Sequence, residues 1–225
     1  MLKIGHRGAR GYEAENTLAS FQKAIDMQVD GIELDVHLSS DGELMVIHDD
    51  TIERTTNGKG EVNTFTKAEL QDFTIEGNYK IPTLKEVFDL VDRRCLINIE
   101  LKSFETAEKT VTLIEKYIQN KNWDYTDFIV SSFDWNALQD VNFRNQKIPI
   151  GVLTEVDLDE ALNFAKFIKA KSINPDFQLL NLENTKKLQE NGFEVFPWTV
   201  NKTADIIRMQ SFNVNGIITD FPDRL

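Results

Sequence analysis

Short apolar runs and longer segments with helical spacing alternate along this chain. The apolar runs have the length of β-strands, and they lie near residues 2–5, 32–36, 44–47, 96–101, 127–132, 148–153, 172–174, 193–200 and 215–219. Between them, apolar residues recur every three or four positions, which is typical of amphipathic helices. Strand and helix are therefore expected to succeed each other from one end of the chain to the other.

Local signals mark where some of these helices begin. Apolar residues from Leu18 to Val29 share one face of a helix that is expected over about residues 17–27. Thr83 and Glu86 have the spacing of a capping box, which predicts the start of another helix. Further apolar stripes predict helices over about 107–118 and 158–168.

The alternation of strand and helix predicts an α/β fold with a parallel sheet, and the number of units favours a closed TIM (β/α)₈ barrel over an open sheet. Because no linker interrupts the pattern, residues 1–225 are expected to form a single domain. Nine apolar runs stand where eight are needed, and the link from 36 to 44 is too short for a helical crossover. Either one run lies outside the ring or one unit lacks its helix. The polar stretch at about 50–80, with a short helix near 67–73, is expected to be an insertion after the third strand.

Composition narrows the possible partners. With 25 Lys and Arg residues against 37 Asp and Glu, the formal charge is -12, which repels nucleic acid and anionic membranes. There is no apolar run of membrane-spanning length and no signal-peptide segment at the start. We therefore expect a cytoplasmic protein without stable membrane association. The single Cys95 excludes an internal disulfide and is expected to fill the core.

Glu33 and Asp35 alternate with apolar residues in the second run. A strand would place both carboxylates on one face, and buried carboxylates are costly unless they are paired or bound to metal. The alternative is a simple hairpin, turning at Asp41-Gly42, whose polar face carries both carboxylates into water. The pattern alone leaves both interpretations open.

Other reactive side chains stand at the ends of predicted strands, where TIM barrels carry their active sites. These are His6, Arg7, His48, Glu100 and Lys102. A set of carboxylate ligands suits a hard cation such as Mg²⁺ or Ca²⁺, and the three histidines are too few for a histidine-rich zinc site. Arginine and lysine suit a phosphate, and histidines suit proton transfer near neutral pH.

The motifs GHRGARGYEAENTLASF, IELDVHLSSDGELMVIHDDTIERTTNGKG, IPTL and INIELK resemble those of the glycerophosphodiester phosphodiesterase family. VSSF, PWTVN and GIITD extend the resemblance more loosely over nearly the whole chain. It implies a TIM barrel with one divalent cation, Mg²⁺ or Ca²⁺, and a small-molecule glycerophosphodiester substrate. The implied roles are metal ligands at Glu33, Asp35 and Glu100, an acid-base pair at His6 and His48, phosphate ligands at Arg7 and Lys102, and an aromatic wall for the glycerol at Trp198.

The resemblance implies hydrolysis of a glycerophosphodiester to sn-glycerol 3-phosphate and an alcohol. A lysophospholipase D-type phosphodiesterase is an alternative, and it would need an apolar entrance for an acyl chain. A non-catalytic binding barrel is a second alternative, but it predicts the loss of a motif residue and none is lost. The preferred headgroup, the preferred cation, the roles of the two histidines, the route by water or by a cyclic intermediate, and the oligomeric state stay open.

Overall fold

The computed structural model describes residues 1–225 and contains a ring of parallel strands in the order β8-β7-β6-β5-β4-β2-β1-β9. The ring closes between β9 and the segment that continues the chain after β8, because Ile218 N donates to Pro197 O (3.0 Å) and Val200 N donates to Ile218 O (3.0 Å). The predicted TIM barrel is therefore confirmed. Its strands are β1 (Leu2–Gly5), β2 (Gly31–Leu38), β4 (Leu96–Leu101), β5 (Phe128–Ser132), β6 (Ile150–Thr154), β7 (Ser172–Pro175), β8 (Glu194–Val195) and β9 (Gly216–Thr219).

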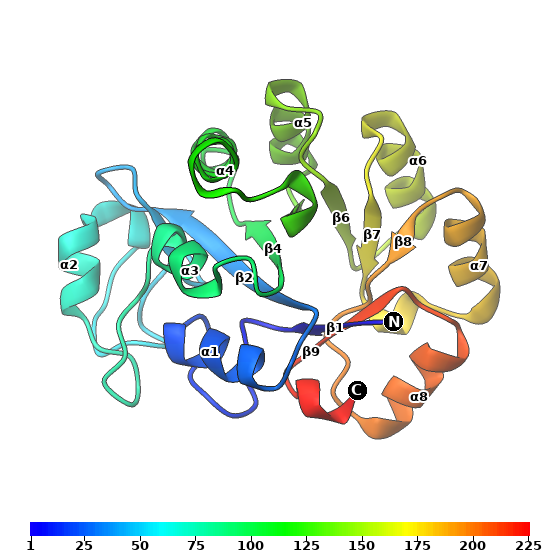
Figure 1. The fold of residues 1–225 in the computed structure, drawn as a ribbon, viewed down its shortest axis with the longest axis horizontal. Helices are drawn as coiled ribbons and strands as arrows, with labels where there is room; N and C mark the ends of the chain where they lie inside the picture. Colours follow the sequence, from blue (N-terminus) through cyan, green and yellow to red (C-terminus); the bar gives the residue numbers. More distant parts are fainter.

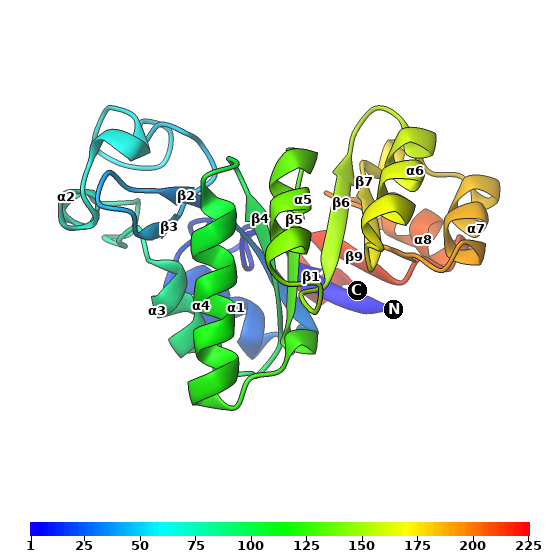
Figure 2. The same cartoon turned by 90° about the horizontal axis from the view of Figure 1, so that it is seen from above.

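Helices surround the ring, as Figure 1 shows. They are α1 (Leu18–Asp26), α3 (Leu84–Val91), α4 (Thr106–Lys121), α5 (Trp135–Arg144), α6 (Leu158–Ile168), α7 (Leu182–Glu190) and α8 (Thr203–Ser211). The last strand, β9, is followed only by a 3₁₀ turn at Pro222–Arg224, and both chain ends lie close together (Figures 1 and 2). No helix combines the length and the apolar composition that crossing a membrane requires.

The ninth run, β3 (Leu44–Val46), lies outside the ring. It pairs only with β2, and the pairing is antiparallel, with Val36 opposite Val46. Nine apolar runs were found where the barrel needs eight strands, and β3 is the run that lies outside the ring. The hairpin of the alternative interpretation exists, but its prediction for the carboxylates is wrong, because Glu33 is 4% exposed and Asp35 only 1%.

The insertion follows β3 and projects to one side of the barrel with its short helix α2 (Lys67–Asp72), as Figures 1 and 2 show. It has a small core of its own, separate from the main one, made by Met45, Ile47, Ile52, Val62, Leu70, Ile75 and Ile81. The insertion is thus an appendage that must be held against the barrel by contacts between the two.

An apolar layer fills the interior of the ring. It consists of Ile4, Ile129, Phe196 and Ile218, all nearly inaccessible to solvent. Side chains two positions apart on a strand face the same way, so the residues two positions after three of these are directed to the same interior, nearer the carboxyl ends of the strands. Those residues are His6, Trp198 and Asp220.

Two local expectations have different outcomes. The capping box is confirmed, since Glu86 N donates to Thr83 Oγ1 and Thr83 N donates to Glu86 Oε2. The strand expected over 193–200 is regular only at Glu194–Val195. Pro197 has no N–H to continue a ladder, although Trp198 N still donates to Pro175 O of β7 (3.1 Å).

Candidate active site

A cavity of about 190 Å³ opens at the carboxyl ends of the ring strands. Of the eight side chains predicted from the sequence, all but Asp35 line it, and Asp35 lies directly behind, in ion-pair contact with Arg7 and Lys102. The full lining is His6, Arg7, Arg10, Glu33, His48, Asn98, Glu100, Lys102, Phe133, Leu153, Trp198, Thr199 and Ile218. The fold therefore brings the predicted residues to one place.

Three carboxylates meet on neighbouring strands β2 and β4. The register places Asp35 beside Glu100 and Glu33 beside Asn98, and one oxygen from each of the three carboxylates lies within 4.8 Å of the others. Asp35 Oδ1 is buried and receives no hydrogen bond. Three converging oxygens, one of them a buried acceptor that receives no hydrogen bond, fit a hard cation, so this cluster could hold a metal ion.

Without a bound cation, the protein stabilises the ionised forms of the three carboxylates unequally. Burial and the neighbouring carboxylates raise the pKa of Glu33 well above its usual value and that of Glu100 to about 7. Burial also opposes ionisation of Asp35, but Arg7 and Lys102 outweigh it and lower its pKa. A bound cation would remove the repulsion that keeps Glu33 and Glu100 from ionising.

Two cations border the carboxylates. Lys102 Nζ lies 2.7 Å from Glu100 Oε1 and 3.5 Å from Asp35 Oδ1. Arg7 lies at the turn after β1 with a φ of 50°, its backbone N–H donates to Glu33 Oε2 (2.9 Å), and its Nη1 donates to Glu15 Oε1 (2.7 Å). Both side chains line the cavity, where they can bind an anion.

An aspartate holds His6 from behind. His6 Nδ1 lies 2.7 Å from Asp220 Oδ1, and Asn201 Nδ2 donates to the other oxygen of Asp220 (2.8 Å). His6 Nε2 lies 4.0 Å from Glu33 Oε2. Burial lowers the pKa of His6, and the hydrogen bond with Asp220 opposes that effect. One ring nitrogen is thus fixed, and the other faces the carboxylates.

His48 has a matching arrangement. Its Nδ1 lies 2.6 Å from Asp49 Oδ1, and His37 Nε2 lies 3.1 Å from the carbonyl oxygen of His48. Asp49 in turn accepts hydrogen bonds from Arg54 of the insertion. Burial lowers the pKa of His48, and the neighbouring carboxylates of Asp35 and Asp49 oppose this shift only in part. His37 therefore has a structural contact, and His48 is presented to the cavity from outside the ring.

Trp198 and Phe133 form an aromatic wall of the cavity. Their rings meet edge to face with centroids 5.4 Å apart, and Trp198 Nε1 donates to Asn174 O (2.7 Å). This bond and the close packing fix the indole, and 43% of Phe133 stays exposed at the rim. Such a wall can contact the carbon atoms of a small ligand.

Comparison with known proteins identifies the chain. A model of the glycerophosphoryl diester phosphodiesterase family matches residues 6–224. The chain belongs to this family. It is accordingly an enzyme, a hydrolase of glycerophosphodiesters, and the alternative of a non-catalytic barrel is wrong.

Individual relatives agree with this family membership. The chain is 40% identical to a glycerophosphodiester phosphodiesterase of Caldanaerobacter subterraneus subsp. tengcongensis, over 100% of this chain and 96% of that protein. The crystal structure of a family member from Thermotoga maritima superposes with a TM-score of 0.83 at 29% identity, covering 99% and 96% of the two chains. The human lysophospholipase D GDPD1 is 25% identical, over 99% of this chain and 84% of that protein.

Sequence reasoning missed several members of this phosphodiesterase site. Asp220 directly follows β9, and a polar residue at that place is a usable signal, but nothing local connects it with His6. Asn16 stands just before the N-cap of α1, Thr17, and was not predicted as a site residue, but its Nδ2 donates to Asp35 Oδ2 (2.9 Å). Arg54 lies in a polar stretch without periodicity, so no pattern indicated its contacts.

Proposed function

We propose that this phosphodiesterase cleaves its substrate to sn-glycerol 3-phosphate and an alcohol, with His6 and His48 as the proton-transfer pair. The observation that carries the proposal is the paired arrangement of the histidines. Each has Nδ1 fixed by an aspartate, and both line a cavity that is shared with two carboxylates, Glu33 and Glu100, and two cations, Arg7 and Lys102. A carboxylate at Nδ1 fixes the tautomer and leaves Nε2 for proton transfer.

We infer that Glu33, Asp35 and Glu100 hold one divalent cation, Mg²⁺ or Ca²⁺, since oxygen ligands alone suit these ions. When bound, the cation stabilises negative charge that develops on the phosphoryl oxygens. Arg7 and Lys102 then bind the phosphate through charge-assisted hydrogen bonds. Trp198 would pack against the carbon atoms of the glycerol.

The two histidines divide the proton transfers of a displacement at phosphorus. One accepts the proton of the attacking hydroxyl as the new P–O bond forms, and the other donates a proton to the alcohol oxygen as the old P–O bond breaks. The attacking group is water or, in a route through a cyclic phosphate, a hydroxyl of the glycerol. In the cyclic route, water must then attack phosphorus and open the ring to give sn-glycerol 3-phosphate. Because both histidines have an aspartate partner, their surroundings do not distinguish acid from base.

Assays with purified protein test the proposal. Glycerophosphocholine and glycerophosphoethanolamine should be cleaved, EDTA should stop the reaction, and His6→Ala and His48→Ala should each lose about 10² to 10⁴ in rate. A p-nitrophenyl phosphodiester needs no acid for its leaving group, so it should selectively rescue the variant that lacks the acid. Rescue of neither variant would show that both histidines act in binding.

Lysophospholipase D activity is the second candidate function, and the similarity to the human lysophospholipase D favours it. The exposed Phe133 at the rim offers an apolar surface beside the cavity. The cavity itself has a volume of only about 190 Å³, which suits a compact headgroup better than an acyl chain. We therefore expect glycerophosphocholine to be cleaved faster than a lysophospholipid in the same assay.

A further inference from the structure

Arg54 of the insertion forms hydrogen bonds to two carboxylates at once. Its Nε and Nη2 donate to the two oxygens of Asp49 at 2.6 and 3.0 Å. Its Nη1 and Nη2 donate to the two oxygens of Glu15 at 3.0 and 2.7 Å. Two edges of the guanidinium are thus used in the bidentate geometry that makes such bonds strong and directional.

Each of these carboxylates also holds a residue that lines the catalytic cavity. Asp49 Oδ1 is bonded to His48 Nδ1 (2.6 Å), and Glu15 Oε1 is bonded to Arg7 Nη1 (2.7 Å). Arg54 therefore joins the supports of one proposed proton-transfer group and one proposed phosphate ligand. It does not line the catalytic cavity itself.

Glu15, the carboxylate that supports Arg7, is bound by more than one arginine. It lies between three arginines, since Arg10 Nε also reaches Glu15 Oε2 at 3.0 Å. Burial works against its ionisation, but the hydrogen bond from Arg54 and the charges of Arg7 and Arg10 lower the pKa of Glu15 to about 2. The carboxylate is therefore charged at any working pH, and its position depends on those arginines.

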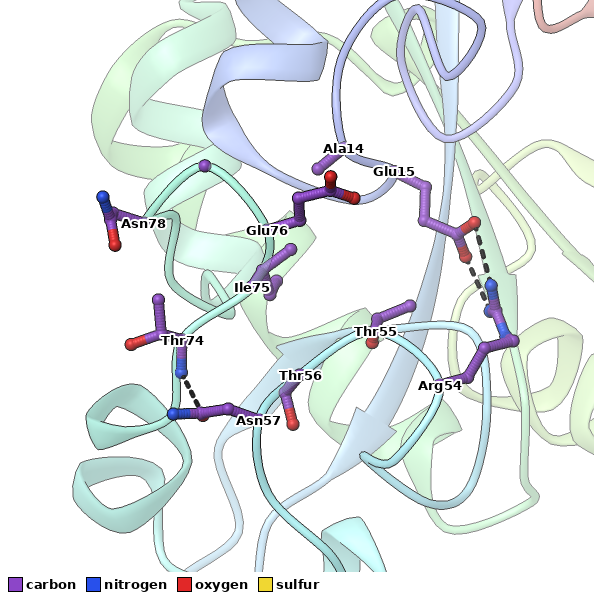
Figure 3. Close-up of a pocket in the computed structure, with 11 residues that line it drawn as sticks. Ala14, Glu15, Arg54, Thr55, Thr56, Asn57, Thr74, Ile75, Glu76 and Asn78 are labelled. Carbon is purple, nitrogen blue, oxygen red and sulfur yellow. Dashed lines mark hydrogen bonds and ion pairs between the residues drawn. The ribbon is translucent and has the colours of Figure 1, made fainter.

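The surroundings of Arg54 show that packing alone does not hold it. Its side chain is 43% exposed, and it stands at the edge of an open polar cavity of about 600 Å³ between the insertion and the β1–α1 loop. Figure 3 shows its guanidinium turned toward Glu15, with the cavity beside it. The hydrogen bonds, and not a shell of neighbours, fix this guanidinium.

We propose that Arg54 is a positioning residue of the phosphodiesterase reaction, which aligns His48 through Asp49 and Arg7 through Glu15. The proposal rests on the function proposed above. It also gives the insertion a catalytic purpose, because Arg54 can make both bonds only when the insertion lies against the β1–α1 loop. Lysine cannot replace it, since an ammonium is a point charge and cannot serve two carboxylates bidentately.

Four proteins should be compared on glycerophosphocholine in saturating Mg²⁺: wild type, Arg54→Ala, Arg54→Lys and Arg144→Ala. Arg144 is the matched control, because it also bridges two carboxylates, Asp140 and Glu108, and is 35% exposed, but it lies on α5 away from the cavity. Arg54→Ala and Arg54→Lys should lower kcat/KM about 10- to 100-fold, as losses of supporting residues typically do. Arg144→Ala should keep the wild-type value. The melting temperature of all three variants should fall by no more than about 4 °C, since exposed ion pairs contribute little stability.

Chemical rescue separates positioning from a structural role. Removing the Arg54 side chain leaves space that is continuous with the open cavity, so guanidinium chloride at millimolar concentration should restore part of the activity of Arg54→Ala. Potassium chloride at equal ionic strength should not, and Arg144→Ala should respond to neither salt. Wild-type kcat/KM in Arg54→Ala, or a loss in that folded variant that guanidinium does not reverse, would overturn the proposal. An inactive wild type would instead refute the proposed function.

Discussion

Replacing Glu100 by glutamine tests whether the carboxylate cluster is under electrostatic stress when no cation is bound. The substitution keeps the shape of the side chain and removes one of the three clustered carboxyl groups. Burial and the charge of Asp35 raise the pKa of Glu100 from 4.5 to about 7, even though Lys102 lies 2.7 Å away. In chelator, the native state therefore resists ionising this group.

Proton linkage determines whether the free energy of unfolding rises or falls with pH. Between pH 4.5 and about 7 the native state binds more protons at Glu100 than the unfolded state does, so the free energy of unfolding falls as the pH rises through this window. For these two pKa values the loss between pH 5 and pH 8 is about 2 to 3 kcal/mol. Glu100→Gln does not titrate there and should not lose this amount.

Urea unfolding in EDTA, followed by tryptophan fluorescence at pH 5 and pH 8, measures the difference. We expect the stability of Glu100→Gln relative to wild type to increase by about 2 to 3 kcal/mol between the two pH values. An exposed carboxylate after β6, Glu155, provides the control, and Glu155→Gln should follow wild type. Adding Mg²⁺ should reverse the order at pH 8, because at 100 times its dissociation constant a ligand adds about 2.7 kcal/mol to the protein that binds it.

Two results would refute this reasoning. If wild type and Glu100→Gln lose stability in parallel between pH 5 and pH 8, Glu100 is not destabilised by its neighbours. If Glu100→Gln is the less stable protein in EDTA at pH 8, the ion pair with Lys102 outweighs the repulsion, and the cluster has a structural role.

Four further outcomes are expected. Excess EDTA should abolish hydrolysis and Mg²⁺ or Ca²⁺ should restore it, so full activity in chelator would contradict a metal site. Asp220→Asn should lower kcat/KM about 10- to 100-fold with little change in melting temperature, because His6 loses its charged partner. An unchanged kcat/KM in this variant would contradict the role of Asp220 in holding His6. Trp198→Ala should raise KM more than it lowers kcat in steady-state assays. Burial raises the pKa of Cys95 to about 11, so an aromatic disulfide reagent at pH 8 should label it only after denaturation.

The sequence alone was sufficient for the features that depend on neighbours along the chain. Alternation of Glu33 and Asp35 with apolar residues predicted a strand with both carboxylates on one face, because side chains alternate across any strand. The pattern left open whether that face is buried. The capping box at Thr83 and Glu86 predicted a helix start, because its hydrogen bonds are made within one turn. Repeated strand and helix units predicted the barrel, and the barrel predicted that reactive residues gather at the carboxyl ends of its strands.

The tertiary structure decided which distant residues meet. His6 and Asp220 are 214 positions apart and bond only because β1 and β9 are neighbours in the closed ring. β3 leaves the ring because its link to β2 is too short for a parallel crossover, a constraint that the pattern showed but could not assign to one strand. Arg54 lies in a segment without periodicity, and its four hydrogen bonds depend on how the insertion packs against the barrel. Periodicity reports local backbone geometry, whereas such contacts follow from ring closure and packing, which no short stretch of sequence contains.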